Sequence, residues 1–154
     1  MQRYDQAIRL YADNGMAEKV EQMNGSERRV YYMPHQAVLR EGSSTTKMRI
    51  VFDASSHGPN SRSLKDNLEG GPNLNPELVA LLLRFRQHRV ALIADVEKAF
   101  LQIGVHEEDC DALRFLWYKE PPHPDQPTPE VEVWRMTRVT FGTTCSPFLL
   151  GATL

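Results

Sequence analysis

The stretch VALIADVEKAFLQI, residues 90–103, places a carboxylate directly after a run of apolar residues. Residues 90–94 are all apolar, and Asp95 follows them. A continuous apolar run is typical of a strand that is buried on both faces, so the sequence predicts a buried strand over residues 90–95. An ionised carboxylate beside a core is costly unless a cation or hydrogen-bond donors contact it. Asp95 is therefore either a capping or salt-bridged side chain or a metal ligand at the end of a strand, and this stretch alone favours the first.

The composition of the chain is that of one ordinary globular domain. The 154 residues are enough to bury a core, and 41% apolar and 25% charged residues are usual for such a domain. The formal net charge of −2 does not indicate a nucleic-acid binder. Basic residues nevertheless gather between Arg28 and Arg49 and between Arg84 and Arg89, and the acidic excess follows Asp95. This asymmetry fits a basic face that binds phosphates beside a separate metal-binding region, or a solvated surface of mixed charge.

Several classes of protein are not indicated by the sequence. The two cysteines, Cys110 and Cys145, provide neither a disulfide framework nor a zinc cluster, and a reducing compartment fits this usage best. No apolar run reaches the roughly 18 residues of a membrane span. Residues 1–15 lack the apolar core of a signal peptide. We therefore expect no membrane partner.

Periodicity and turn residues predict a mixed α+β chain. Helices are expected over residues 4–11, 17–23, 75–85, 97–103 and 107–112, and strands over residues 30–39, 48–52, 90–95, 113–118 and 131–136. The strands on either side of the Ser/Thr-rich residues 42–46 are expected to form a hairpin. In the helix over residues 75–85, Asn75 is the expected N-cap and Pro76 takes the first position. Apolar residues at helical spacing then predict a packed stripe, formed by Leu78, Leu81, Leu82 and Phe85.

Three segments, in this order along the chain, carry a resemblance to a known family. They are TTKMRIVFDAS at residues 45–55, ADVEKAFLQI at residues 94–103 and MTRVTFGTTCSPF at residues 136–148. Together they resemble the reverse transcriptases, most closely those of BEL/Pao-type LTR retrotransposons. YYMPHQAVLRE at residues 31–41 and LLLRFRQHRVALIAD at residues 81–95 are similar to the same group. The resemblance covers nearly the whole chain from about Tyr31 onwards, and the order and spacing of the segments make it specific.

This resemblance implies a fold and a domain organisation. The fold would be α+β, with a reverse-transcriptase-like fingers hairpin and helices that lead into an incomplete antiparallel palm sheet. Residues 1–154 would form a partial reverse transcriptase domain. Its N-terminal helices and fingers would occupy about residues 1–90, and the start of the palm would occupy about residues 90–154. The parent element would assemble in a cytoplasmic virus-like particle.

Asp95 gains a role from the resemblance. Polymerases of the family join a nucleotide to a primer by phosphoryl transfer assisted by two divalent ions, and hard ions such as Mg²⁺ or Mn²⁺ bind carboxylate oxygens. The first essential aspartate of the family lies at the end of a palm strand and matches Asp95, which the resemblance therefore implies to be a catalytic metal ligand. Val96 would add its backbone carbonyl. The resemblance thus favours the ligand over the cap, and a structural aspartate is the alternative.

The first segment is implied to bind the phosphates of the nucleotide. Arg49 matches the phosphate-binding arginine of the family within MRIVFD, and Lys47 is a looser match on the same hairpin strand. A guanidinium is suited to bidentate contacts with phosphate oxygens. The alternative is a solvent-facing strand edge, where basic side chains oppose aggregation.

Phe100, Phe141 and Gly142 are implied to complete the nucleotide-binding site. Phe100 matches an aromatic residue that presses on the sugar and excludes a 2′-hydroxyl by a steric clash, and a core phenylalanine is the alternative. Phe141 and Gly142 match the pair at the base of the pocket, although retroviral enzymes carry glutamine at the first position and many LTR retrotransposons carry an aromatic residue. Gly142 would allow the backbone to approach the nucleotide or template closely. Ser146 and Pro147 would then open the next helix; a plain turn is the alternative.

One motif of the family has no counterpart in this sequence. The family carries a Tyr-x-Asp-Asp hairpin downstream of the third segment, and no two adjacent aspartates occur among the 154 residues. Asp109 and Asp111 do not replace it, because side chains two positions apart on a helix point away from each other. The expected entity is therefore a fragment of an RNA-directed DNA polymerase, inactive alone, that lacks the second acidic motif, the thumb, RNase H and integrase.

The resemblance also implies partners. The complete enzyme would bind an RNA or DNA template-primer, dNTPs and two Mg²⁺ or Mn²⁺ ions, and the chain would belong to a retrotransposon polyprotein. The second hypothesis is a degenerate or co-opted remnant that binds nucleic acid without catalysis. The third is an unrelated α+β domain that has no nucleotide site.

Overall fold

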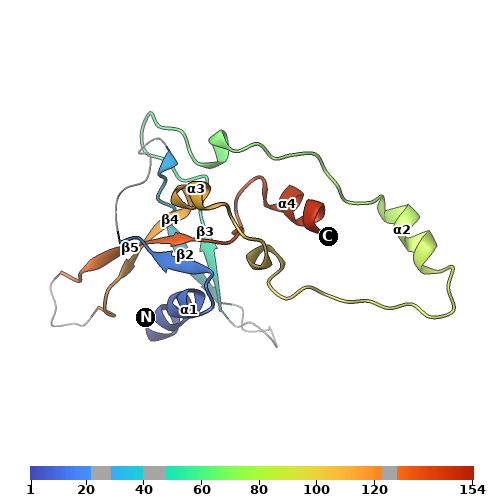
Figure 1. The fold of residues 1–154 in the computed structure, drawn as a ribbon, viewed down its shortest axis with the longest axis horizontal. Helices are drawn as coiled ribbons and strands as arrows, with labels where there is room; N and C mark the ends of the chain where they lie inside the picture. Colours follow the sequence, from blue (N-terminus) through green and yellow to red (C-terminus); the bar gives the residue numbers. More distant parts are fainter. Residues whose placement is uncertain (22–28, 40–47, 123–127) are drawn as a thin grey trace.

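The structure, a computed structural model, describes residues 1–21, 29–39, 48–122 and 128–154. The chain is mixed α+β with two small antiparallel sheets (Figure 1), which confirms the expected class. The helices are α1 (Gln2–Asp13), α2 (Leu78–Phe85), α3 (Glu107–Cys110) and α4 (Ser146–Thr153), with the 3₁₀ turns η2 (Lys65–Asn67), η3 (Ala99–Gln102) and η4 (Asp111–Leu113). The strands are β1 (Ala17–Lys19), β2 (His35–Leu39), β3 (Met48–Phe52), β4 (Arg114–Tyr118) and β5 (Val131–Met136).

β5 is the central strand of the larger sheet, whose order is β1-β5-β4. Both pairings are antiparallel, with Ala17 opposite Met136 and Phe115 opposite Trp134. These four side chains are buried, as the period of two predicts for the inner face of a half-buried sheet. The predicted strands over residues 113–118 and 131–136 are therefore confirmed.

Helix α1 packs on this sheet and ends at Asp13. Its Ile8 side chain is fully buried in the core that contains the sheet residues. The Asp5 carboxylate accepts a hydrogen bond from the indole Nε1 of Trp117 on β4 at 2.9 Å. The helix is capped by Asn14, and Gly15 follows with a φ of +63°, a left-handed conformation that favours glycine. The predicted helix over residues 4–11 is confirmed.

The predicted hairpin is confirmed by the antiparallel pairing of β2 with β3, in which His35 lies opposite Phe52. An aromatic cluster joins the base of this hairpin to the larger sheet. The centroid of the His35 ring lies 5.4 Å from that of Phe115 and 5.5 Å from that of Trp117, and the Phe52 and Phe115 centroids are 5.3 Å apart. The tip of the hairpin, residues 40–47, lies outside the described residues.

The surroundings of His35 favour its neutral form. His35 Nε2 donates to the Leu116 carbonyl oxygen at 3.0 Å, and the Tyr4 hydroxyl donates to His35 Nδ1. Burial lowers the pKa of His35 below its ordinary value of 6.5, and the hydrogen bond to Leu116 opposes this only in part. Burial, with a smaller contribution from Tyr11, raises the pKa of Tyr4 to about 12. Tyr4 therefore stays uncharged over the pH range in which His35 titrates.

A chain of ion pairs runs beside the core of the larger sheet. Arg114, whose side chain is 3% exposed, donates to the Asp111 carboxylate at 2.9 Å, and Arg135 donates to the same carboxylate at 3.2 Å. Arg135 also pairs with Glu18 on β1 at 2.5 Å. Although burial by itself raises the pKa of Asp111, the hydrogen bonds and charges of Arg114 and Arg135 hold it below its ordinary value. Asp111 is therefore the ionised partner of a buried arginine.

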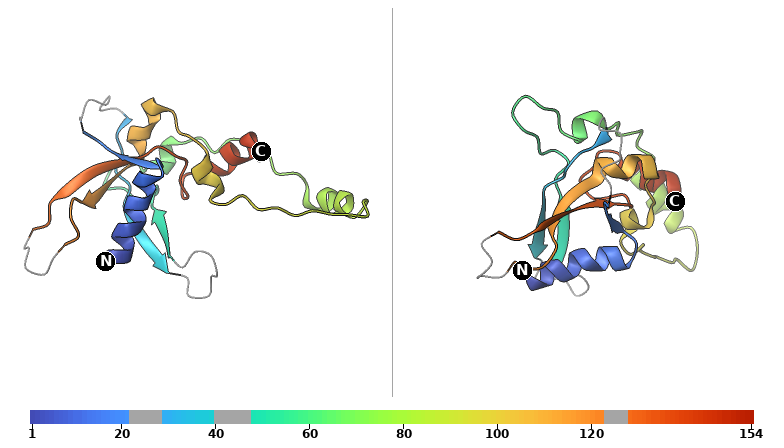
Figure 2. Two further views of the ribbon diagram at one scale, coloured as in Figure 1. Left: turned by 60° about the horizontal axis from the view of Figure 1, so that its bottom comes forward. Right: turned by 60° about the vertical axis from the view of Figure 1, so that its left-hand side comes forward.

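Residues 75–96 leave the body of the molecule as an arm that carries α2 (Figure 1; Figure 2, left). No residue of α2 is buried, and Leu78 and Leu83 stay 65% and 62% exposed. The predicted helix is confirmed, but the predicted packing of its apolar stripe is wrong. The helix begins at Leu78 with Glu77 as its N-cap, so Asn75 is not the cap.

The predicted buried strand over residues 90–95 is also wrong. These residues form no strand, and Leu92 and Ile93 are each 88% exposed. A strand is stable when neighbours pair with its backbone N–H and C=O groups. Within the described ranges, no strand pairs with residues 90–95, and the apolar run therefore stays extended in water.

Two further findings concern helices. Residues 17–23 were expected to be helical, which is wrong for residues 17–19, because they form β1 and pair with β5; residues 22 and 23 lie outside the described part of the chain.

Among the helices of the described ranges, none is both long and apolar enough to cross a membrane.

Candidate functional site

Phe100 and Phe141, which come from the second and third of the three segments, are in contact. Their ring centroids lie 4.7 Å apart with the ring planes at 79°, an edge-to-face arrangement that stabilises aromatic pairs. Phe100 is half-buried on η3, where Leu101 is buried, and Phe141 keeps 50% of its surface exposed. The chain enters η3 through Lys98, whose φ is +52°. The pair therefore presents an aromatic surface that is partly open to solvent.

Gly142 brings the third segment against the first. Its φ is +99°, in the region that favours glycine. A Cβ at this position would lie 2.6 Å from the backbone carbonyl oxygen of Phe52, at the end of β3, which is closer than van der Waals contact allows. The close backbone approach expected of Gly142 is thus made to β3. Its approach to a nucleotide or template stays a prediction.

Buried hydroxyls fix the turn that begins at Phe141. Ser146 Oγ donates to the Thr140 carbonyl oxygen at 2.7 Å and forms a hydrogen bond with Thr143 Oγ1. All three of these residues are buried. α4 begins at Ser146 with a proline in its first turn, as the sequence predicts. These hydrogen bonds hold the backbone that presents Phe141 next to Phe100.

Arg49 lies on β3, three residues before Phe52, and its side chain is exposed. At about 3.3 Å per residue it stands roughly 10 Å along the strand from Phe52. Residues an odd number of positions apart leave a strand on opposite faces, so Arg49 points away from the face on which Phe52 is buried. Its neighbour across the hairpin is Val38. Lys47, the other expected phosphate ligand, lies outside the described residues.

Asp95 lies in the arm and is exposed. Because no strand ends there, the expected position of Asp95 at the end of a central strand is wrong. Val96 is 46% exposed, and residues 96–99 separate Asp95 from Phe100. A hydrogen bond links this segment to η3, because Gln102 Nε2 donates to the Glu97 carbonyl oxygen at 3.1 Å.

The described residues do not form the expected metal site. In residues 1–21, 29–39, 48–122 and 128–154, no group of three His, Cys, Asp or Glu side chains could hold an ion. Asp95 is a single carboxylate, and two ions with oxygen ligands need several. Binding of Mg²⁺ or Mn²⁺ at Asp95 and the Val96 carbonyl therefore requires carboxylates from outside this set.

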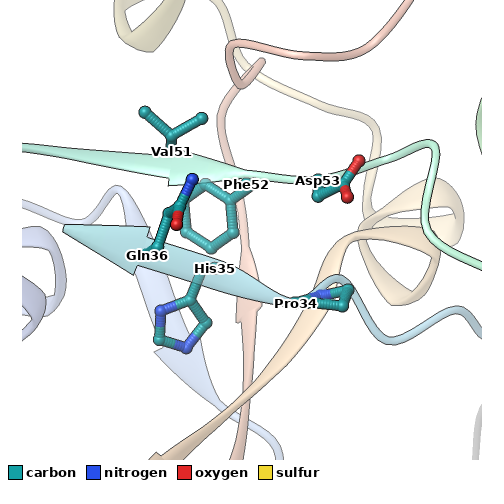
Figure 3. A pocket seen from close by; sticks show the side chains of 6 residues that line it. All are labelled: Pro34, His35, Gln36, Val51, Phe52 and Asp53. Carbon is teal, nitrogen blue, oxygen red and sulfur yellow. The ribbon is translucent and has the colours of Figure 1, made fainter. Parts of the chain in front are cut away.

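An open hollow at the base of the hairpin is a separate feature of the surface. Six residues line it, Pro34, His35, Gln36, Val51, Phe52 and Asp53 (Figure 3). The Asp53 carboxylate already accepts hydrogen bonds from the Ser55 hydroxyl at 2.6 Å and from the Ser55 backbone N–H at 2.9 Å. These bonds hold the pKa of Asp53 below its usual value. The charged group of the hollow is thus engaged within the protein, and no residue expected in the nucleotide site lines it.

Sequence analysis did not identify Phe52 or the hydroxyl groups of the turn. The glycine at position 142 indicated that some group approaches closely, but nothing in the sequence specified the Phe52 carbonyl. The sequence carries only a weak signal of this hydrogen-bonded turn. Hydroxyl residues recur there at three-residue intervals before a proline, at Thr140, Thr143 and Ser146.

Comparison with known proteins gives no assignment for this chain. No protein-family model matches it, and a search of curated proteins finds no match. The resemblance of the three segments to the reverse transcriptases therefore stays a prediction.

Proposed function

We propose that this chain is the fingers and the first part of the palm of an RNA-directed DNA polymerase of the LTR-retrotransposon type. The observation that carries the proposal is the meeting of three segments that lie apart in the sequence. Phe100 of the second segment contacts Phe141 of the third. Gly142 of the third packs against the end of β3 in the first. Contact between segments that lie apart in the sequence supports the proposal, because a nucleotide site draws its residues from several segments. Arg49 and Asp95 are not part of this contact.

In the proposed enzyme, the aromatic pair bounds the nucleotide. Phe100 presses on the sugar and excludes a 2′-hydroxyl by its volume, and Phe141 supports Phe100 through their edge-to-face contact. Arg49 is exposed on β3, and together with Lys47 it binds phosphate oxygens through charge-assisted hydrogen bonds. The hairpin thus supplies the positive charge that binds the phosphates, and the turn at Phe141 supports the aromatic wall beside the sugar.

Asp95 has its proposed role in a longer chain. Divalent ions, when bound, stabilise the charge of the transferring phosphoryl group, and Asp95 with the Val96 carbonyl is the part of their site that this chain contributes. Residues 90–94 become a buried strand there, once the rest of the palm pairs with them. Because the described residues do not form the ion site, no catalytic step is assigned to this chain alone.

A remnant that binds nucleic acid without catalysis is the second candidate function. The observation in its favour is an exposed basic group at the end of α2, formed by Arg84, Arg86 and Arg89. Such a group attracts phosphates whatever the sequence of the nucleic acid, and the binding weakens steeply with salt.

The test is the product of the parent transcript continued beyond Leu154. The polymerase proposal expects that this longer protein contains a second acidic pair and extends a primer with Mg²⁺ or Mn²⁺, whereas the 154-residue chain does not extend it. Asp95-dependent extension by the 154-residue chain would overturn the fragment assignment. An expressed transcript that stops after Leu154, together with salt-sensitive duplex binding, would favour the remnant.

A further inference from the structure

The arm, residues 75–96, exposes more apolar surface than a monomer ordinarily leaves in water. Its large apolar side chains are between 41% and 88% exposed, a set formed by Leu78, Val79, Leu81, Leu82, Leu83, Phe85, Val90, Leu92, Ile93 and Val96. Together they expose on the order of 1,000 Å², distributed over more than one side of the arm, and exposed apolar area of this extent marks interaction surfaces. A stable protein interface needs about 800 Å² from each partner. The arm alone therefore has the area of an interface.

This apolar surface is not confined to one side of the arm. No residue of α2 is buried, and Leu82 and Leu83 are neighbours in sequence that are both exposed. Every residue from 90 to 94 is apolar, so both faces of the extended chain carry apolar groups. A partner must pair with the backbone edge of residues 90–94 and must also cover their faces.

We propose that the arm is a self-association surface, and that two copies of this chain join by antiparallel pairing of residues 89–95 about a two-fold axis at Leu92. Such an isologous contact uses the same residues twice and closes on itself. It gives the backbone N–H and C=O groups of the apolar run the partners that a strand needs.

Charge selects the register of this pairing. With Leu92 opposite Leu92, Val90 lies opposite Ala94, and Arg89 of one copy lies opposite Asp95 of the other. Two-fold symmetry forms the Arg89–Asp95 pair twice, once at each end of the apolar run. Opposite charges directly across an antiparallel pair stabilise it, and a shift of register by one residue removes both pairs.

α2 provides a cover for the paired segments. A two-stranded ribbon is marginally stable in water and needs a helix or a further strand on its apolar face. α2 ends at Phe85, four positions before Arg89, so each copy places an apolar helix next to the ribbon. The proposal rests on the exposure and the sequence of the arm. It concerns the 154-residue chain, because the palm strands of the proposed longer polymerase would pair with the same edge of residues 90–94.

Sedimentation equilibrium of the 154-residue chain tests the pairing by charge exchange. The wild type is expected to be a dimer that dissociates on dilution. Arg89→Asp and Asp95→Arg each place like charges opposite each other at both ends of the run, and each is expected to raise the dimer dissociation constant at least about tenfold. An equimolar mixture of the two variants restores both opposite-charge pairs and is expected to form a 1:1 heterodimer as tight as the wild-type dimer.

Arg62→Asp is the matched control, because Arg62 is exposed and lies outside the arm. This change is expected to leave the dissociation constant unchanged, and circular dichroism of each variant verifies that the chain folds. Three results would overturn the proposal. They are a wild type that stays monomeric up to about 0.1 mM, a mixture that binds no more tightly than its components, and open-ended assembly in place of a closed dimer. If the arginines of the arm bind nucleic acid in place of a second copy, the protein alone is expected to stay monomeric, which is the first of these results.

Discussion

Replacement of Gly142 by alanine tests the contact that joins the third segment to the first. Gly142 has a φ of +99°, and a Cβ there would lie 2.6 Å from the Phe52 carbonyl oxygen. The backbone conformation alone costs a non-glycine residue about 1–3 kcal/mol. The clash adds to this cost, because the atom that the methyl group meets belongs to the backbone of β3 and cannot rotate away. We expect a loss of about 3–5 kcal/mol in the free energy of unfolding, a large part of the roughly 5–15 kcal/mol of a typical domain.

Two other glycines separate the effect of backbone conformation from that of the clash. Gly15 also has a positive φ, +63°, but a Cβ there would meet no atom within 4 Å. Gly15→Ala should therefore cost about 1–2 kcal/mol, from the backbone conformation alone. At Gly104 the nearest atom would be the end of the Arg138 side chain at 3.6 Å, and Gly104→Ala should change stability by less than about 1 kcal/mol.

Urea denaturation followed by tryptophan fluorescence measures the three free energies, because Trp117 and Trp134 are buried in the core. The expected order of destabilisation is Gly142→Ala, then Gly15→Ala, then Gly104→Ala. If Gly142→Ala destabilises the protein no more than Gly15→Ala, the turn does not press on β3, and the contact between the third segment and the first is refuted.

Three further predictions concern the core and the aromatic pair. Burial lowers the pKa of His35, so the folded protein favours the neutral imidazole. The contribution of neutral His35 to the free energy of unfolding is complete above the ordinary pKa of 6.5. This contribution is lost as the pH falls from 6.5 towards the folded-state pKa, because the unfolded chain then binds the proton more readily. The urea midpoint should thus be lower at about pH 5 than at about pH 8, and His35→Gln should reduce the difference; equal wild-type midpoints would contradict this. Asp111→Asn leaves the buried Arg114 without its carboxylate and should cost about 2–4 kcal/mol of unfolding free energy, whereas Asp109→Asn, in an exposed pair, should cost less than about 0.5 kcal/mol. In the longer polymerase, Phe100→Ala should weaken discrimination between dNTPs and rNTPs in primer extension, and unchanged selectivity would return Phe100 to the role of a core side chain.

Elements whose pattern and partner are close in the sequence are predicted correctly. β4 and β5 follow one another along the chain, and the alternation that buries Trp134 and Met136 is visible in the residues themselves. The end of α1 is equally local, because Asn14 and Gly15 supply the stop.

Elements decided by distant partners are not predicted from local pattern. Residues 17–19 form a strand because they pair with β5 near the other end of the chain, and this pairing overrides any local preference for helix. Residues 90–95 have the composition of a buried strand, but both the predicted strand and its predicted burial are wrong. Burial depends on a neighbour, and among the described strands none pairs with this run.

The candidate site was predictable in part. Of the residues that the resemblance named, Phe100 contacts Phe141, and Gly142 packs against the Phe52 carbonyl; their role in a nucleotide site stays a prediction. The positive φ of Gly142 agrees with the expectation that this position needs glycine. The contact with Phe52 and the exposed place of Asp95 could not be predicted, because each depends on which backbone lies opposite.

The most direct test of the central claim, that this chain belongs to the nucleotide site of a polymerase, is primer extension by the longer protein that carries Asp95→Asn. Asparagine keeps the shape of aspartate but removes the charge that holds a divalent ion, whereas Glu97→Gln removes an exposed carboxylate two residues away and serves as the control. We expect Asp95→Asn to abolish extension, a loss of several kcal/mol of transition-state stabilisation, and Glu97→Gln to retain it. Duplex binding should survive in both variants, because it rests on Lys and Arg contacts to phosphates. Normal turnover by the Asp95→Asn protein would contradict the assignment.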